Sequence, residues 1–121
     1  MSDGHTYIEQ VAEKGAAAVI VEKDVEAPEG LTVIKVKDTR YALAMTSAAY
    51  FGYPAEKLKV TGITGTKGKT TTTYMVKSIL EEVGIRVGLI GTIEHHLGNE
   101  VVTSQNTTPD AFTIQSYFAK W

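Results

Sequence analysis

A glycine-rich turn in the middle of the chain most constrains the fold. It reads Gly65-Thr66-Lys67-Gly68-Lys69-Thr70 and separates a β-branched segment, residues 59–64, from an amphipathic segment, residues 69–83. The first segment predicts a strand, and the second predicts a helix because its apolar residues recur at helical spacing. Those apolar residues are Val76, Ile79, Leu80 and Val83. A strand that leaves such a turn as a helix is the first half of a βαβ unit.

The turn has the chemistry of a site for phosphate groups. Gly65 and Gly68 carry no Cβ, so consecutive backbone N–H groups can approach an anion closely. The helix that follows adds its unpaired N–H groups and the positive end of its dipole. We predict that Lys69 is catalytic, through its charge on the β- and γ-phosphates, and that Thr70 offers a hydroxyl to Mg²⁺. The predicted ATP-binding residues are Gly65, Thr66, Lys67, Gly68, Lys69, Thr70 and Thr71.

The glycine spacing differs from the common Walker A pattern. That pattern requires a glycine where this chain has Ile63, whereas Gly62 comes one position early and Gly65 two positions late. The alternative is a glycine-rich strand-to-helix turn in which Lys69 is merely solvated. The flanking segments and the Gly-Lys-Thr sequence at the junction favour phosphate binding.

The residues before the turn predict a smaller α/β unit. Residues 7–14 form a helical pattern that ends at Gly15. The runs 17–21 and 31–36 predict two strands, of which the first has the composition of a strand buried on both faces. These segments are short, so we interpret them as part of a domain.

A helix and a chain break follow. Asp38 is placed to cap a helix that continues to Gly52. Gly52-Tyr53-Pro54 then interrupts regular structure. We predict a domain boundary here, with residues 1–56 in an N-terminal domain and residues 57–121 in a second domain.

The residues after the predicted long helix complete the fold prediction. Residues 86–90 predict a second strand, joined to the first by a right-handed crossover. Residues 93–103 resemble a hairpin that turns at Gly98-Asn99. Thr108-Pro109-Asp110 predicts the start of a last helix with Pro109 at its first position. The fold class is therefore α/β: a partial N-terminal α/β domain, then the first βαβ unit of a P-loop-type parallel sheet with a β-hairpin.

Composition argues against several kinds of partner and site. The net charge of −2 argues against nucleic acid, and the absence of cysteine removes thiolate catalysis and thiolate zinc sites. His95 and His96 are neighbours on a predicted strand and so point to opposite faces, which disfavours a shared metal ion. The longest apolar run, residues 16–21, is too short to span a bilayer, and the first residues are polar. We expect a cytoplasmic protein without a membrane partner.

The loop and two further segments resemble a known family. Residues 62–71, Gly-Ile-Thr-Gly-Thr-Lys-Gly-Lys-Thr-Thr, resemble the ATP loop of the Mur ligases, which use this shifted glycine spacing. They most resemble the MurE branch, although Lys67 stands where that branch more often has asparagine. Asp3-Gly4-His5, together with residues 15–22, is similar to the later part of the branch's UDP-binding domain. Asn106-Thr107-Thr108-Pro109-Asp110 resembles the segment that contacts the muramoyl-dipeptide substrate.

The resemblance implies an ATP-dependent ligase of peptidoglycan synthesis. Such an enzyme adds diaminopimelate or lysine as the third residue of UDP-MurNAc-L-Ala-D-Glu, with ATP and Mg²⁺. ATP phosphorylates the D-glutamyl carboxylate, and the incoming amino group attacks the acyl phosphate. By resemblance, Asn106, Thr107 and Thr108 bind the substrate. Taken alone, the same residues predict a helix start with Thr107 or Thr108 as cap.

The resemblance also implies that much of the enzyme lies outside these 121 residues. Its other magnesium ligands, its carbamylated lysine, its adenine contacts and its amino-acid-binding domain are expected after Trp121, and its uridine contacts before Met1. We therefore expect the chain alone to bind ATP at most.

Two rival hypotheses stay open. A folylpolyglutamate synthase-like ligase shares Gly-Thr-Lys-Gly-Lys but usually continues with Gly-Ser, where this chain has Thr70-Thr71. The chain could also be a nucleotide-binding module without chemistry.

Overall fold

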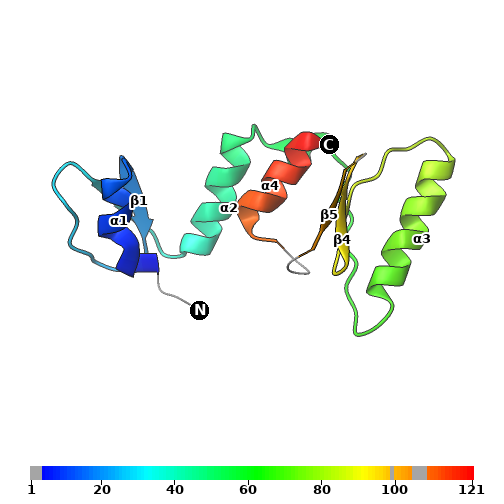
Figure 1. Cartoon of the computed structure of the whole chain (residues 1–121), viewed down its shortest axis with the longest axis horizontal. Coiled ribbons are helices and arrows are strands. Elements are labelled where there is room, and N and C mark those ends of the chain that lie inside the picture. The colour runs from blue at the N-terminus through cyan, green and yellow to red at the C-terminus, as the bar shows by residue number, and fades with distance from the viewer. Residues whose placement is uncertain (1–3, 99, 105–108) are drawn as a thin grey trace. The chain divides into compact units, whose positions relative to one another are not determined.

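The structure, a computed structural model, describes residues 4–98, 100–104 and 109–121. It divides into two compact units, Met1–Met45 (unit 1) and Thr46–Trp121 (unit 2). Figure 1 labels their helices and strands. Both units mix helices with strands, which agrees with the predicted α/β class. The predicted functional boundary after residue 56 stays a prediction.

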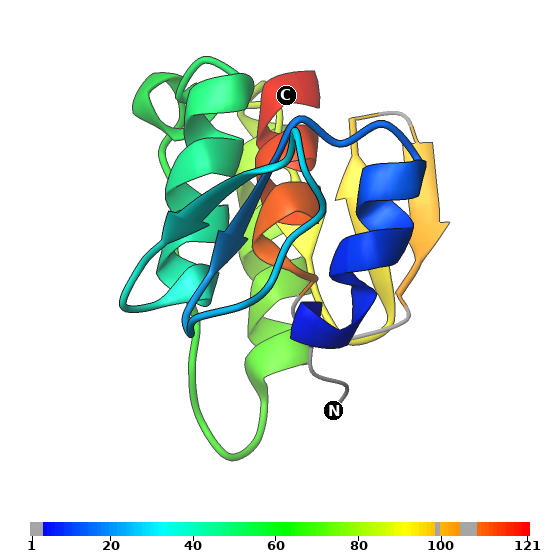
Figure 2. The ribbon, with the colours of Figure 1, turned by 90° about the vertical axis from the view of Figure 1, so that its left-hand side faces the viewer.

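Unit 1 contains a short helix beside two parallel strands (Figure 2). Ala18 lies opposite Thr32 and Val21 opposite Lys35 in the strand register. Ile8 and Val21 are its buried hydrophobic residues, 7% and 3% exposed. The elements of this part are η1 (Gly4–Tyr7), α1 (Ile8–Glu13), β1 (Ala18–Val21) and β2 (Thr32–Lys35). All three predicted segments of this unit are therefore formed.

The prediction that the first strand is buried on both faces is wrong. Along β1 only Val21 is buried, and Ile20 keeps 38% of its surface exposed. Every residue of β2 is exposed. A strand is buried on both faces only when layers cover each side of its sheet, and a two-stranded sheet with one short helix does not supply them.

Two carboxylates hold the start of α2 (Thr39–Tyr50). Asp38 Oδ1 accepts hydrogen bonds from the backbone N–H groups of Arg40 and Tyr41 at 2.9 and 3.1 Å, so the predicted cap is confirmed. Glu22 Oε1 accepts from both the backbone N–H and the hydroxyl of Thr39, each at 2.8 Å. These two bonds hold the pKa of Glu22 below its usual value.

The chain break predicted after α2 is present. Gly52 and Tyr53 both adopt positive φ angles, 76° and 54°, and the 3-10 helix η2 (Pro54–Lys57) follows. Phe51 then packs against Phe112 of the last helix, with ring centroids 5.2 Å apart. This contact joins the start and the end of unit 2.

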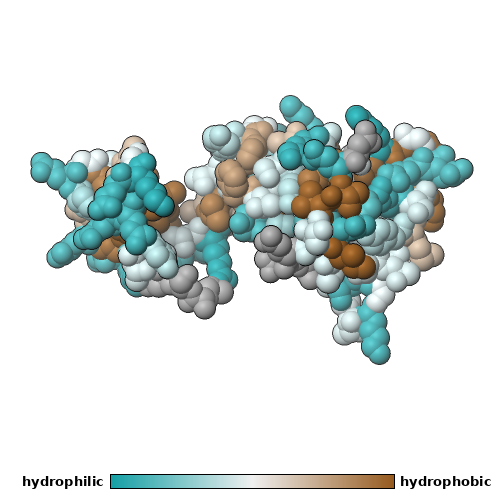
Figure 3. Space-filling model, in the orientation of Figure 1, coloured by the Kyte–Doolittle hydropathy of each residue, from teal (hydrophilic) through white to brown (hydrophobic). Residues whose placement is uncertain are grey.

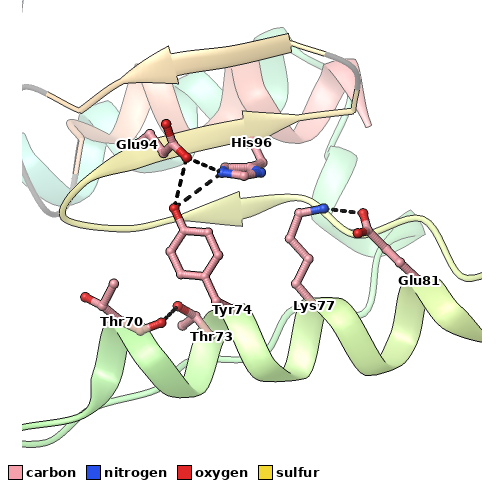
Figure 4. Close-up of polar contacts among 7 residues, drawn as sticks. All are labelled: Thr70, Thr73, Tyr74, Lys77, Glu81, Glu94 and His96. Atoms are coloured by element: carbon pink, nitrogen blue, oxygen red, sulfur yellow. Dashed lines mark hydrogen bonds and ion pairs between the residues drawn. The ribbon is translucent and has the colours of Figure 1, made fainter.

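Unit 2 places one helix on each face of a three-stranded antiparallel sheet (Figures 1 and 4). The predicted long helix is confirmed as α3. The predicted hairpin is confirmed as β4 and β5, with Gly98 at φ 69° in its turn. The remaining elements of this unit are α3 (Lys69–Glu82), β3 (Leu89–Ile90), β4 (Glu94–Leu97), β5 (Glu100–Thr103) and α4 (Ala111–Lys120).

The predicted strand over residues 59–64 is not formed, and so the predicted crossover between two parallel strands is wrong for this structure. The second predicted strand is shortened to β3, which pairs antiparallel with β4 through Leu89–His96 and Ile90–His95. A strand needs a neighbour for its backbone N–H and C=O groups. Within the described residues β3 takes β4 as that neighbour, and residues 59–64 have none.

The last helix begins later than predicted. Asp110, not Thr107 or Thr108, is the N-cap of α4, and its carboxylate accepts the backbone N–H of Thr113 at 2.7 Å. Pro109 therefore precedes the cap and is not the first helical residue. The Thr113 hydrogen bond holds the pKa of Asp110 below its usual value. Aspartate caps well because its short side chain reaches the free N–H groups of the first turn.

Two buried leucines and one close contact define the packed part of unit 2. Leu89 and Leu97 are buried hydrophobic residues of the sheet, 5% and 7% exposed. The indole of Trp121 lies so close to Gly88 that any Cβ at that position would collide with the ring.

None of the helices in the described part of the chain has the length and apolar character that a membrane span requires.

Candidate phosphate-binding site

The glycine-rich turn leads directly into α3, as the sequence predicts. Gly68 is the N-cap of the helix in the left-handed region, at φ 78° and ψ 2°. Its carbonyl accepts the backbone N–H of Thr72 at 2.9 Å, which starts the helical hydrogen bonding. In this described segment no side chain caps the helix. The N–H groups of the first turn are thus left for an anion or for water.

Lys69 folds back over the turn. Its Nζ donates a hydrogen bond to the carbonyl oxygen of Gly65, four residues earlier. The ammonium group therefore lies at the glycine-rich turn, beside the start of α3. A cation and a helix N-terminus at the same place form an attractive site for a polyphosphate.

Thr70 lies where the turn meets an open groove along α3. The groove has a volume of about 540 Å³. Its lining residues are Thr70, Thr71, Tyr74, Met75, Ser78, Ile79 and Ile93. Thr66 and Lys67 are exposed at the tip of the turn. A threonine hydroxyl next to a polyphosphate suits Mg²⁺, which accepts oxygen ligands from protein and phosphate together, so the residues present fit this ion.

A polar cluster lies one helical turn from Thr70 (Figure 4). The Tyr74 hydroxyl donates to Glu94 Oε1 at 3.1 Å, and His96 Nε2 lies 2.9 Å from the same oxygen. His96 Nε2 also lies 3.4 Å from the Tyr74 hydroxyl, and the two rings meet edge-on with centroids 5.5 Å apart. The cluster connects α3 to β4.

The environment of this cluster changes the acidity of the tyrosine. Burial raises the pKa of Tyr74, and the hydrogen bond and negative charge of Glu94 raise it further. Tyr74 therefore keeps its proton in the neutral range and acts as a donor to Glu94.

The two adjacent histidines have different surroundings. His95 is 3% exposed and packs against Tyr117 of α4 at a centroid distance of 5.5 Å, whereas His96 faces α3. The prediction that they point to opposite faces is confirmed. Across residues 4–98, 100–104 and 109–121 no group of three histidine, cysteine or acidic residues is arranged to hold a metal ion.

The predicted substrate-binding residues Asn106, Thr107 and Thr108 lie outside the described residues, so their role stays a prediction. The flanking residues are described: the N–H of Ser104 donates to the carbonyl of Ile93 at 3.1 Å.

Sequence reasoning did not find the Tyr74 cluster. Two spacings could have indicated it. Tyr74 comes four residues after Thr70 and so lies on the same side of the helix. Glu94 and His96 are two residues apart on a strand and so share a face. Neither spacing reveals that the helix and the strand meet.

Comparison with known proteins identifies relatives of the chain. A family model described as Mur ligase middle domain matches residues 63–121. A protein of Clostridium perfringens named UDP-N-acetylmuramoyl-L-alanyl-D-glutamate--2,6-diaminopimelate ligase is 50% identical over 96% of this chain and 24% of its own length.

Proteins of Bacillus licheniformis and Geobacter metallireducens with the same name are 46% and 43% identical, over 98% and 94% of this chain. The chain spans 24% and 22% of the lengths of these two relatives.

Proposed function

The chain belongs to the Mur ligase family, and we propose that it carries the phosphate-binding loop of a UDP-N-acetylmuramoyl-L-alanyl-D-glutamate--2,6-diaminopimelate ligase. The whole protein would join diaminopimelate to a UDP-muramoyl dipeptide, in the cytoplasm, at the expense of ATP. Because the chain spans about a quarter of its relatives' length, this activity is proposed for the whole protein.

One observation carries the proposal. The ammonium group of Lys69 is held on the carbonyl of Gly65, at the uncapped N-terminus of α3. A positive charge, a glycine turn and the free N–H groups of a helix start are thus brought together over a few residues. Each of these attracts phosphate oxygens, and together they fit the β- and γ-phosphates of ATP.

The chemistry explains why such a ligase needs this site. A carboxylate is a poor electrophile because it is anionic and its oxygen is a poor leaving group. Transfer of a phosphoryl group to it removes both obstacles, and the incoming amine then displaces phosphate. Lys69 would offset the negative charge that develops on the transferred group. Mg²⁺, when bound, neutralises phosphate charge, and Thr70 would supply one of its oxygen ligands.

The proposal also covers the second substrate and the sheet of the whole protein. Asn106, Thr107 and Thr108 would hold the muramoyl dipeptide. The names of the relatives favour diaminopimelate over lysine as the added residue, and they favour a Mur ligase over a folylpolyglutamate synthase-like enzyme. A P-loop-type parallel sheet is proposed for the whole protein only.

Calorimetric titration of the chain with Mg²⁺·ATP tests the loop. We expect measurable binding that Lys69→Ala abolishes, because the substitution removes the cation at the turn. Lys57→Ala is the matched control: it removes an exposed lysine outside the predicted ATP-binding residues and should leave binding within about twofold, a small change on the affinity scale. Equal binding by the wild-type chain and the Lys69→Ala variant would overturn the assignment of the loop.

A further inference from the structure

We propose that Tyr74, Glu94 and His96 form a positioning network. It fixes the first turn of α3, which carries Lys69 and Thr70, against β4. The inference rests on the proposed function and adds three residues to it. None of them is expected to touch ATP. Their role is to hold Lys69 and Thr70 in the orientation that binding requires.

The contacts make the network a connection between two elements. Glu94 Oε1 is shared by the Tyr74 hydroxyl at 3.1 Å and by His96 Nε2 at 2.9 Å. Tyr74 comes from α3, and the other two residues come from β4 (Figure 4). The side chains of His96 and Glu94 are 16% and 35% exposed. Partly buried hydrogen bonds with a charged acceptor are stronger than exposed neutral ones.

The network lies close to the turn that it would position. Tyr74 follows Thr70 by four residues, which is about 6 Å along a helix axis. Tyr74 and Thr70 also line the same groove. A rotation or shift of α3 against β4 would therefore move Thr70 and the Lys69 ammonium with it.

The network also restrains the carboxylate of Glu94. An unpaired negative charge near a polyphosphate site would repel the ligand, since charges interact over about 10 Å at 0.1 M salt. Tyr74 and His96 engage Oε1 on the side facing α3. Lys77, one turn further along the helix, is ion-paired with Glu81 of its own helix and forms a separate contact (Figure 4).

The same strand connects to the predicted substrate segment. β4 begins directly after Ile93, whose carbonyl accepts the N–H of Ser104, the residue before 105–108. Ile93 itself lines the groove beside Thr70. The network therefore links α3 to β4, the first strand of the hairpin β4–β5. The predicted substrate-binding residues Asn106, Thr107 and Thr108 follow this hairpin in the sequence.

Calorimetry with Mg²⁺·ATP and urea unfolding, both on the 121-residue chain, test the network. Glu94→Gln keeps an acceptor oxygen for Tyr74, whereas Glu94→Ala removes it, and neither variant carries the charge. We expect Glu94→Ala to bind about threefold to tenfold more weakly than Glu94→Gln, the effect of one lost hydrogen bond. Tyr74→Phe should weaken binding by a similar factor. The double variant Tyr74→Phe/Glu94→Ala should bind no more weakly than Glu94→Ala, because Glu94→Ala already removes the Tyr74–Glu94 hydrogen bond.

Ser78→Ala is the matched control, since Ser78 lines the same groove on α3 and lies outside the network. It should bind as the wild type does. A purely structural role would lower the urea midpoint of Glu94→Ala while leaving its folded-state affinity equal to that of Glu94→Gln, and this result would overturn the network. If Lys69→Ala loses binding while the variants at Tyr74 and Glu94 bind Mg²⁺·ATP as the wild type does, the proposed function stands and only the network is refuted. A wild-type chain that binds no Mg²⁺·ATP would refute both.

Discussion

Lys69 illustrates how much a single residue of this chain depends on its neighbours in sequence. Its partner, the carbonyl of Gly65, lies only four residues away, and the glycines between them allow the turn. Local geometry is therefore enough to bring charge and turn together. This is why the loop could be predicted from the sequence, including the position of Lys69 at the start of a helix.

Tyr74, Glu94 and His96 show the opposite case. Their contact joins residues 20 and 22 positions apart, and no residue pattern states that α3 lies against β4. The sequence marks each as a polar residue on one face of its element. Their convergence depends on the packing of the helix on the sheet.

Gly88 provides a residue-scale prediction. Gly88→Ala should destabilise unit 2 by about 1–3 kcal/mol, the usual cost of overpacking, because the new methyl group would collide with the Trp121 indole. Urea unfolding followed by tryptophan fluorescence measures the change. Gly62→Ala is the control, since a Cβ there meets nothing within 4 Å. Equal loss of stability in both variants would show that the indole contact is not the cause.

At the scale of elements, local signals predicted the helices well. Asp38 and Gly68 mark the starts of α2 and α3 where predicted, and Gly98 turns the hairpin. Helices and hairpins satisfy most of their hydrogen bonds locally, so sequence patterns suffice for them. The start of α4 was predicted too early because threonine, proline and aspartate all favour helix starts, and the sequence does not rank them.

The cap of α4 leads to a prediction about pH. The pKa of Asp110 is lowered in the folded chain, so its contribution to stability is present above the ordinary aspartate value of 3.8 and is lost as pH falls through the lowered folded value. Asp110→Ala should cost about 1 kcal/mol at neutral pH.

Asp110→Asn separates the cap from its charge. Asparagine caps almost as well and does not titrate, so its stability relative to the wild type should rise as the pH is lowered from 6 to about 2.5. Urea midpoints from circular dichroism at the two pH values provide the comparison. A difference between wild type and Asp110→Asn that stays constant with pH would contradict the assignment of the cap.

At the scale of the whole molecule, apolar faces predicted from the sequence are present but partly uncovered. Val76 and Ile79 of α3 keep 39% and 64% of their surface exposed, and Val83, its C-cap residue, keeps 69%. Figure 3 shows hydrophobic surface over the hairpin of unit 2, where Val101 and Val102 are exposed. The face of α3 was predicted from its spacing, whereas its exposure depends on what packs against it.

The extent of the chain leads to a prediction about activity. The chain spans 24% of the length of its Clostridium perfringens relative. We therefore expect the chain to bind Mg²⁺·ATP without forming an amide bond from UDP-muramoyl dipeptide and diaminopimelate. Phosphate release and mass spectrometry of the products measure this directly. Amide product that disappears in Lys69→Ala would contradict the expectation and show that these residues suffice for catalysis.

The amino-acid order alone determined the features whose contacts are close in sequence: the glycine-rich turn, α2 and α3 after their caps, and the hairpin at Gly98. Backbone stereochemistry and helical hydrogen bonding act over a few residues, so these features need no distant partner. Only the tertiary structure decided that residues 59–64 pair with none of the described strands, that β3 pairs with β4, and that Tyr74 meets Glu94. Sheet pairing and side-chain packing join distant residues, and the choice among such partners depends on all the surfaces that compete for them.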